Sequence, residues 1–182
     1  MEPHNHKTSI IILTAFGMLA GAGCTLSAEA DVKDVEITWH GLRFDGAPEG
    51  TPTGMISVTR SFELDASNAA WAKQLNANVR VTKVHVRAAD GVENLDFVQL
   101  ASVSMADAAC AQAPVPIMYI ERPATAASSP EVEGENSPAV DATSAWSGER
   151  VRVDVTLAGV LPRQAWAIDV SLWLDGEIAL VP

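Results

Sequence analysis

Oxygen-bearing side chains gather at one point of the sequence. Asp90, Glu93, Asn94 and Asp96 fall within seven residues, around the turn-forming pair Asp90-Gly91. Calcium is commonly bound by carboxylate and amide oxygens that one such loop supplies. The alternating ligand pattern and closing glutamate of an EF-hand are absent from this segment. The segment therefore predicts either a calcium site at these four residues or a solvated hairpin turn, and the hairpin is the simpler interpretation.

Catalytic and other metal chemistry finds few residues to use. Beyond the N-terminal segment the histidines are His40 and His85, and neither has a second ligand at metal-binding spacing. The chain contains no Gly-x-Ser-x-Gly elbow and no glycine-rich phosphate loop. We therefore predict no catalytic residue, no enzyme activity and no cofactor. A hydrolase is the weakest of the functional interpretations, because carboxylate pairs that meet in space leave no sequence spacing.

Tryptophans are the remaining candidates for binding. Trp39 and Trp166 share the parity of the apolar residues around them, which predicts core positions. Trp173 lies on the polar side of its strand, and Trp146 lies outside the clear strands. An exposed tryptophan can stack on sugars or anchor a protein partner. Trp173 and Trp146 are thus the binding candidates, and the alternative is that each ring covers an edge of the core.

The N-terminal segment carries the clearest functional motif. Residues 10–22 are the most hydrophobic run, and their length of about 13 falls short of the roughly 20 needed to span a membrane. This length predicts a signal peptide over residues 1–23. The run ends in Leu-Ala-Gly-Ala-Gly-Cys24, which resembles the lipobox of bacterial lipoproteins in the two small residues before the cysteine. It departs from that motif at Gly21, where the family has leucine.

The lipobox resemblance implies a location. In bacterial lipoproteins the cysteine becomes the lipid-modified first residue, so Cys24 would carry palmitate and related acyl chains and hold the protein on a membrane. Thr25 is not the aspartate associated with inner-membrane retention, which implies the outer membrane of the cell envelope. Cleavage after 20–22 or after 28–30, both of the small-x-small type, would instead give a periplasmic or secreted protein.

Composition limits the partners. The chain has 182 residues, with 12 Lys and Arg against 23 Asp and Glu and a net charge of −11. Such a surface repels phosphate backbones, so we predict no nucleic-acid binding. Cys110 has no partner if Cys24 is lipidated, which argues against a disulfide framework. About 155 residues remain after the signal peptide, enough for one domain.

Alternation of apolar and polar residues predicts a series of strands. The first has a bulge at His40-Gly41, where the apolar parity changes, and the last three would form a three-stranded meander. The predicted strands are 35–44, 56–64, 79–87, 95–105, 116–121 at an edge, 151–157, 166–174 and 178–180.

The other segments complete a predicted domain plan. Residues 24–33 are expected to be a tether, residues 34–182 a β-sandwich, and residues 68–75 a short helix. Residues 122–150, rich in Pro, Ser, Ala and Glu, predict a long flexible loop. The expected fold is all-β, a single antiparallel sandwich of immunoglobulin-like architecture, with a closed barrel as the alternative.

These observations favour an envelope lipoprotein with a non-catalytic structural or protein-interaction domain. Its partners would be the membrane, through Cys24, and an envelope protein or glycan. The alternative is a secreted module that binds carbohydrate or calcium.

Overall fold

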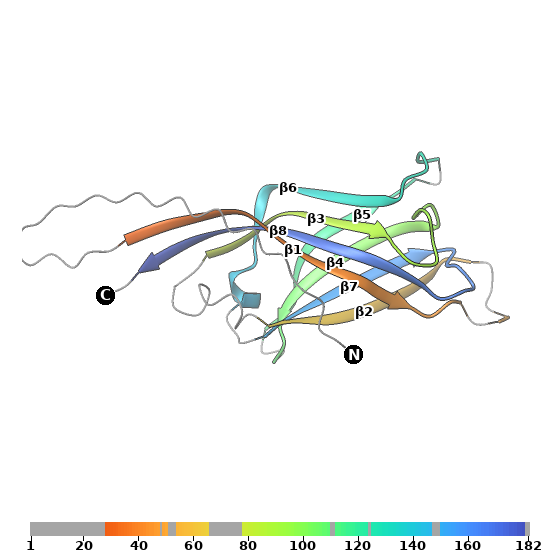
Figure 1. The fold of residues 1–182 in the computed structure, drawn as a ribbon, viewed down its shortest axis with the longest axis horizontal. Coiled ribbons are helices and arrows are strands. Elements are labelled where there is room, and N and C mark those ends of the chain that lie inside the picture. The colour runs from red at the N-terminus through yellow and green to blue at the C-terminus, as the bar shows by residue number, and fades with distance from the viewer. Residues whose placement is uncertain are drawn as a thin grey trace, which may run out of the picture.

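The computed structural model describes residues 28–47, 49–50, 54–65, 78–109, 112–123, 125–146 and 150–180. In this part of the chain eight strands form two four-stranded antiparallel sheets, which pack on a shared core (Figure 1). The predicted all-β sandwich is therefore confirmed. Sheet A contains β1 (Ala28–Phe44), β3 (Asn78–Ala88), β6 (Glu131–Asp141) and β8 (Trp166–Leu180). Sheet B contains β2 (Ile56–Asp65), β4 (Val98–Asp107), β5 (Val115–Glu121) and β7 (Arg150–Gly159).

The strand order identifies the topology. Sheet A runs β1-β8-β3-β6 and sheet B runs β2-β7-β4-β5. Hydrogen-bonded neighbours thus include the nested pairs β1/β8, β2/β7, β3/β6 and β4/β5, as in a chain folded in half and rolled into two sheets. This is a jelly roll. The finer expectation of immunoglobulin-like architecture is not confirmed, since an immunoglobulin domain has a different strand order. Alternation reports which face a residue occupies and not which strand it pairs with.

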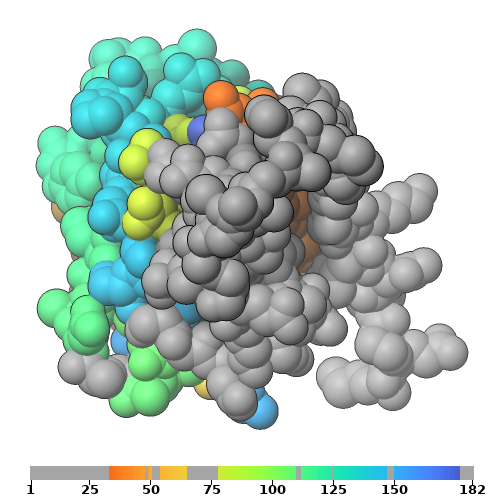
Figure 2. All heavy atoms as spheres, turned by 90° about the vertical axis from the view of Figure 1, so that its left-hand side faces the viewer, coloured from red at the N-terminus to blue at the C-terminus, as the bar shows by residue number. Residues whose placement is uncertain are grey.

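Antiparallel pairing gives the sandwich two distinct ends. The β1–β2, β3–β4, β5–β6 and β7–β8 connections lie at one end, which we call the loop end. At the other, terminal end, β1 and β8 project together beyond the other strands, and Ala28 pairs with Leu180 (Figure 1). Figure 2 looks onto the terminal end, where the green to cyan spheres of β5 and β6 form one flank of the molecule.

Bulges explain the changes of parity in the sequence. The register of β1 with β8 shifts between Trp39 and Leu42, where Gly41 has a φ of 68°. This confirms the predicted bulge at His40-Gly41. In β3 the register shifts between Val81 and Lys83, so valines of both parities face the core.

The predicted hairpins are absent from the described residues. Asp90-Gly91 does form a turn, with a φ of 85° at Gly91, but β3 and β4 belong to different sheets. The predicted three-stranded meander is wrong for the same reason, since β7 and β8 lie in opposite sheets. Nor does Asp175-Gly176 turn the chain, because β8 runs straight through it to Leu180. Turn residues indicate a change of direction and say nothing about which sheet the chain enters next.

The predicted long loop over 122–150 contains regular structure. Residues 131–141 form β6, the edge strand of sheet A, and Thr143–Trp146 form a 3-10 turn, η2, that buries Trp146. The Glu, Gly, Ser and Pro content that suggested a loop is also what protects an edge strand from further pairing. Residues 28–33, predicted to belong to the tether, lie in β1.

Other predictions lie outside the described residues. These are the signal peptide 1–23, the lipid site Cys24, the helix 68–75 and Cys110. No helix among the described residues is long and apolar enough to cross a membrane.

One apolar core lies between the sheets, and an aromatic cluster fills it toward the loop end. Trp166, 1% exposed, stacks on Phe44 with ring centroids 4.3 Å apart and meets Phe97 edge-on at 5.0 Å. At the β5/β6 side Asn136 donates to the carbonyl oxygens of Val81 at 3.2 Å and Ile117 at 2.9 Å, which joins the two sheets. The sandwich is thereby closed on that side, and its outer faces are left to interact with other molecules.

Candidate functional site

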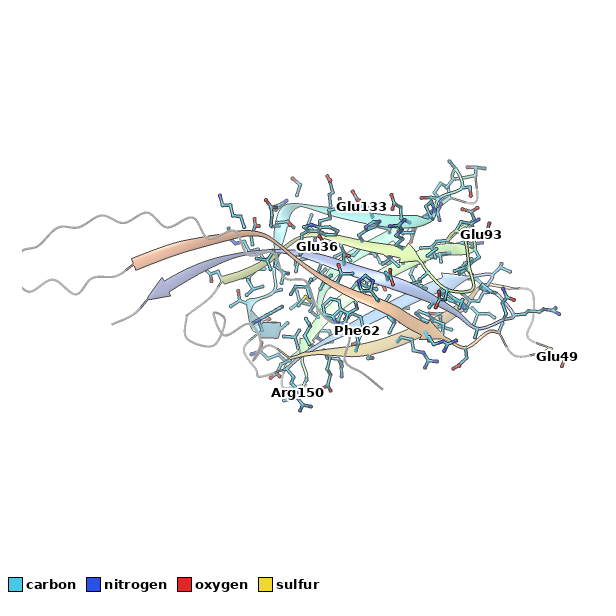
Figure 3. The ribbon with its side chains drawn as sticks, viewed as in Figure 1. Glu36, Glu49, Phe62, Glu93, Glu133 and Arg150 are labelled. Carbon is cyan, nitrogen blue, oxygen red and sulfur yellow. The ribbon has the colours of Figure 1, made fainter. Side chains whose placement is uncertain are left out.

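The outward side chains of sheet A line up in four rows across its strands. We call this set the sheet A face: Asp34, Asp175, Arg80 and Asp141; Glu36, Trp173, Lys83 and Glu135; Thr38, Ser171, His85 and Glu133; His40, Asp169, Arg87 and Glu131. Figure 3 labels Glu36 and Glu133, which stand on the two edge strands of sheet A. The rows hold eight carboxylates and three Lys or Arg side chains.

Trp173 lies near the centre of the sheet A face. Its predicted position on the polar side of the strand is confirmed, and its side chain is half-buried. The Lys83 ammonium lies 5.0 Å from the centroid of the ring, in the geometry of a cation–π contact, and the His85 ring centroid is 6.2 Å away. Lys83 Nζ also pairs with Glu133 Oε2 at 2.8 Å, and this hydrogen bond raises the pKa of Lys83. The ring therefore already accommodates a positive charge.

Hydroxyl groups of β1 and β8 form a second set of hydrogen bonds on the sheet A face. Thr38 Oγ1 lies 2.7 Å from Ser171 Oγ and donates to Glu36 Oε1 at 3.0 Å. Ser171 is nearly buried, at 9% exposure, so its hydroxyl depends on this contact. The register places Glu36 directly opposite Trp173. Glu36 therefore stands opposite Trp173 on the neighbouring strand, with its side chain bonded to Thr38.

Sequence reasoning missed the acidic strand β6. The sequence predicts a flexible loop there, whereas the three glutamates of β6 point outward from the edge strand, and Glu133 and Glu131 contact Lys83 and His85 of β3. His85 Nε2 lies 2.9 Å from Glu131 Oε2, one residue pair along from the Lys83–Glu133 contact. The alternation of glutamates with Val132, Gly134 and Asn136 was the signal for a strand with one inward face.

The calcium candidates are used differently in the structure. Asp96 accepts from Ser128 Oγ at 2.5 Å and from the Ser129 amide at 3.0 Å, and these bonds lower its pKa. Asn94 accepts from the Asp96 amide at 3.2 Å. Among the described residues no group of three or more His, Cys, Asp or Glu could hold a metal ion. The Asp96 carboxylate instead ties the β5–β6 connection to the β3–β4 connection, and neither Asp90 nor Glu93 joins it in a ligand set.

Trp146 is not a surface binding residue. It lies on η2 with 6% of its side chain exposed and packs in the core, which corrects its candidacy. The alternative expectation, that the ring covers part of the core, fits this position. The core position predicted for Trp166 is confirmed, whereas Trp39 is half-buried against Phe62 at 4.4 Å.

The outward side chains of sheet B form a contrasting surface, rich in hydroxyl groups. We call this set the sheet B face: Ser57, Thr59, Ser61 and Glu63 on β2; Arg152, Asp154 and Thr156 on β7; Ser102 and Ser104 on β4; Tyr119 and Glu121 on β5. Thr59 and Thr156 bond across the strands at 2.8 Å. Tyr119, 64% exposed, donates to Glu121 at 2.6 Å. Sequence reasoning missed Tyr119, whose parity opposite to buried Met118 was the available signal.

Comparisons with known proteins add no family. No family model matches the chain, and no curated protein is similar to it. One solved structure with some likeness is described as the structure of infectious bursal disease virus Gx strain, at 9% identity and a TM-score of 0.25. The match covers 92% of this chain, which spans 40% of that one. A TM-score this low gives the likeness no weight for function.

Proposed function

We propose that this chain is a lipid-anchored protein of the bacterial envelope, whose jelly-roll domain binds a protein partner through the sheet A face and performs no catalysis. The observation that carries the proposal is Trp173, a half-buried tryptophan on the polar side of a central strand. Lys83 lies over its ring, and Glu36 stands opposite it in the register. Tryptophans in such polar surroundings are typical anchors of protein interfaces. Proposed membership of the lipoproteins rests on the lipobox resemblance alone.

The proposed anchor has a geometric consequence. β1 begins at Ala28, four residues after Cys24. An extended chain covers at most about 3.5 Å per residue, so the lipid would lie within about 14 Å of the start of β1. The terminal end would face the outer membrane, and the strands of both faces would rise from it with the loop end farthest away.

Labelling with palmitate tests the anchor. We expect wild-type cells to incorporate the label into this protein and Cys24→Ala cells to lose it. Cys110→Ser is the matched control, because it removes the other cysteine and leaves the lipobox intact. Label retained in the Cys24→Ala protein would contradict the lipoprotein assignment and favour a periplasmic or secreted protein.

Site-specific photocrosslinking in the envelope tests the face. A photoreactive residue in place of Thr38 would sit on the sheet A face, and one in place of Thr59 would sit at a similar position on the sheet B face. We expect a discrete protein adduct from position 38 and none from position 59. Adducts from position 59 alone would contradict the proposed face.

A glycan-binding module is the second candidate. The sheet B face favours it, because Tyr119 is exposed beside rows of serine and threonine hydroxyls. A glycan array would test it, with a signal that Tyr119→Ala abolishes. An array without signal would remove this candidate.

A further inference from the structure

The charge of the sheet A face is distributed unevenly over its strands. β3 carries the cations Arg80, Lys83 and Arg87 together with His85, and β6 beside it carries only carboxylates in the same rows. Lys83 forms an ion pair with Glu133 at 2.8 Å, and His85 Nε2 lies 2.9 Å from Glu131 Oε2. The positive charge of Lys83 is therefore balanced by the neighbouring strand β6.

The carboxylates of β1 and β8 have different partners. Glu36 accepts from the Thr38 hydroxyl and Asp175 from the amide of Asp34. Asp169 accepts from the amide of Gly41 and also lies 3.1 Å from Nδ1 of His40. Hydroxyl and amide donors satisfy an oxygen without cancelling its charge. Even with Arg43, which follows in the next row toward the loop end, carboxylates exceed Lys and Arg on this face by two to one. The β1/β8 half of the face thus presents negative charge to any partner.

Trp173 lies on this negative half and already has an ammonium over its ring. Lys83 shows that the ring accepts a cation, and Glu36 lies opposite it in the register. An aromatic ring beside a carboxylate suits a guanidinium or ammonium, which stacks on the ring and pairs with the oxygens. A neutral sugar would stack equally well but would leave the excess carboxylates unmatched.

We propose that the sheet A face docks a basic segment of a partner protein, with an arginine or lysine side chain between Trp173 and Glu36. This inference rests on the proposed function and names the chemistry of the partner. The charge complementarity would steer association and make it sensitive to salt. Lys83 would compete with the incoming cation for the ring.

Binding of a labelled peptide of alternating arginine and threonine to the purified full chain tests this inference by fluorescence anisotropy. We expect Trp173→Ala to weaken binding about tenfold and Glu36→Gln about threefold. Tyr119→Ala, the exposed aromatic of the sheet B face, is the matched control and should change nothing. A peptide with glutamine in place of arginine should not bind.

A misfolded variant loses binding, so a variant that gains it gives a second and independent test. Lys83→Met should tighten binding about threefold, because it removes the ammonium that lies over the Trp173 ring. Equal weakening by Trp173→Ala and Tyr119→Ala, or equal binding of the glutamine peptide, would overturn the inference. If the arginine peptide does not bind while position 38 still crosslinks a partner, the sheet A face binds a partner but the segment that it binds is not basic. If both experiments fail, the proposed function falls as well. A glycan that binds in a Trp173-dependent way would replace the basic segment.

Discussion

The two outer faces of the sandwich differ far more than its two inner faces do. Both inner faces present valine, leucine and isoleucine, whereas the sheet A face carries charge around a tryptophan and the sheet B face carries mainly hydroxyl groups. The inner residues are constrained by packing against each other. The outer ones are not, so a difference between them points to function. This difference is why we propose partner binding on the sheet A face, where Thr38, Ser171 and Glu36 are linked by hydrogen bonds.

Deleting core methyl groups should have the largest effect and should be alike in both sheets. Leu172 on β8 and Leu157 on β7 are both fully buried in central strands. Each Leu→Ala change should cost about 2–5 kcal/mol through lost contacts and a cavity. Denaturant unfolding measures this cost. A loss below about 1 kcal/mol at one site alone would show that the sheets do not share a core of equal packing.

Removing one hydroxyl group from each face should lower the free energy of unfolding by different amounts. Thr59→Val breaks the exposed bond to Thr156 and should cost about 0.2–1 kcal/mol. Thr38→Val should cost about 1–3 kcal/mol, because it leaves the nearly buried Ser171 hydroxyl without this partner. The same unfolding experiment compares the two valine variants. Equal losses of unfolding free energy would show that the Thr38–Ser171 bond stabilises the fold no more than the Thr59–Thr156 bond does.

The loop end, which both faces share, should weaken in acid. Hydrogen bonds from Ser128 and Ser129 lower the pKa of Asp96 below its ordinary 3.8. Its contribution to stability is therefore present above that value and is lost as the pH falls through the lowered folded-state pKa. Asp96→Asn should flatten the acid side of a stability-against-pH curve. An unchanged acid side would contradict this role.

The smallest effect is spectroscopic and belongs to the sheet B face. Tyr119 is the only tyrosine of the chain, so its ultraviolet titration is unambiguous. Its hydrogen bond to Glu121 raises its pKa above the ordinary 10.0, and the associated stability is lost as the pH rises through the raised value. Glu121→Gln should move the titration midpoint down. A midpoint that does not move would show that the bond is absent in solution.

Alternation predicted every strand except β6, and the bulge at His40-Gly41, because burial imposes it directly. It could not predict the jelly roll, since Asp90-Gly91 and Asp175-Gly176 resemble turns equally although only the first turns the chain. It found Trp173 on the polar side of β8 from parity alone. It could not show that Lys83 and Glu36 flank that ring, because they come from strands distant in sequence. β6 was missed because edge strands and loops share a composition.

Carboxyl footprinting by mass spectrometry tests the central claim most directly. The labelling of Glu36 and Asp175 on the sheet A face is compared with that of Glu63 and Glu121 on the sheet B face, in the purified chain and in its native envelope. The account predicts that the envelope protects Glu36 and Asp175 and leaves Glu63 and Glu121 unchanged. Protection of Glu63 and Glu121 alone, or of neither pair, would contradict it.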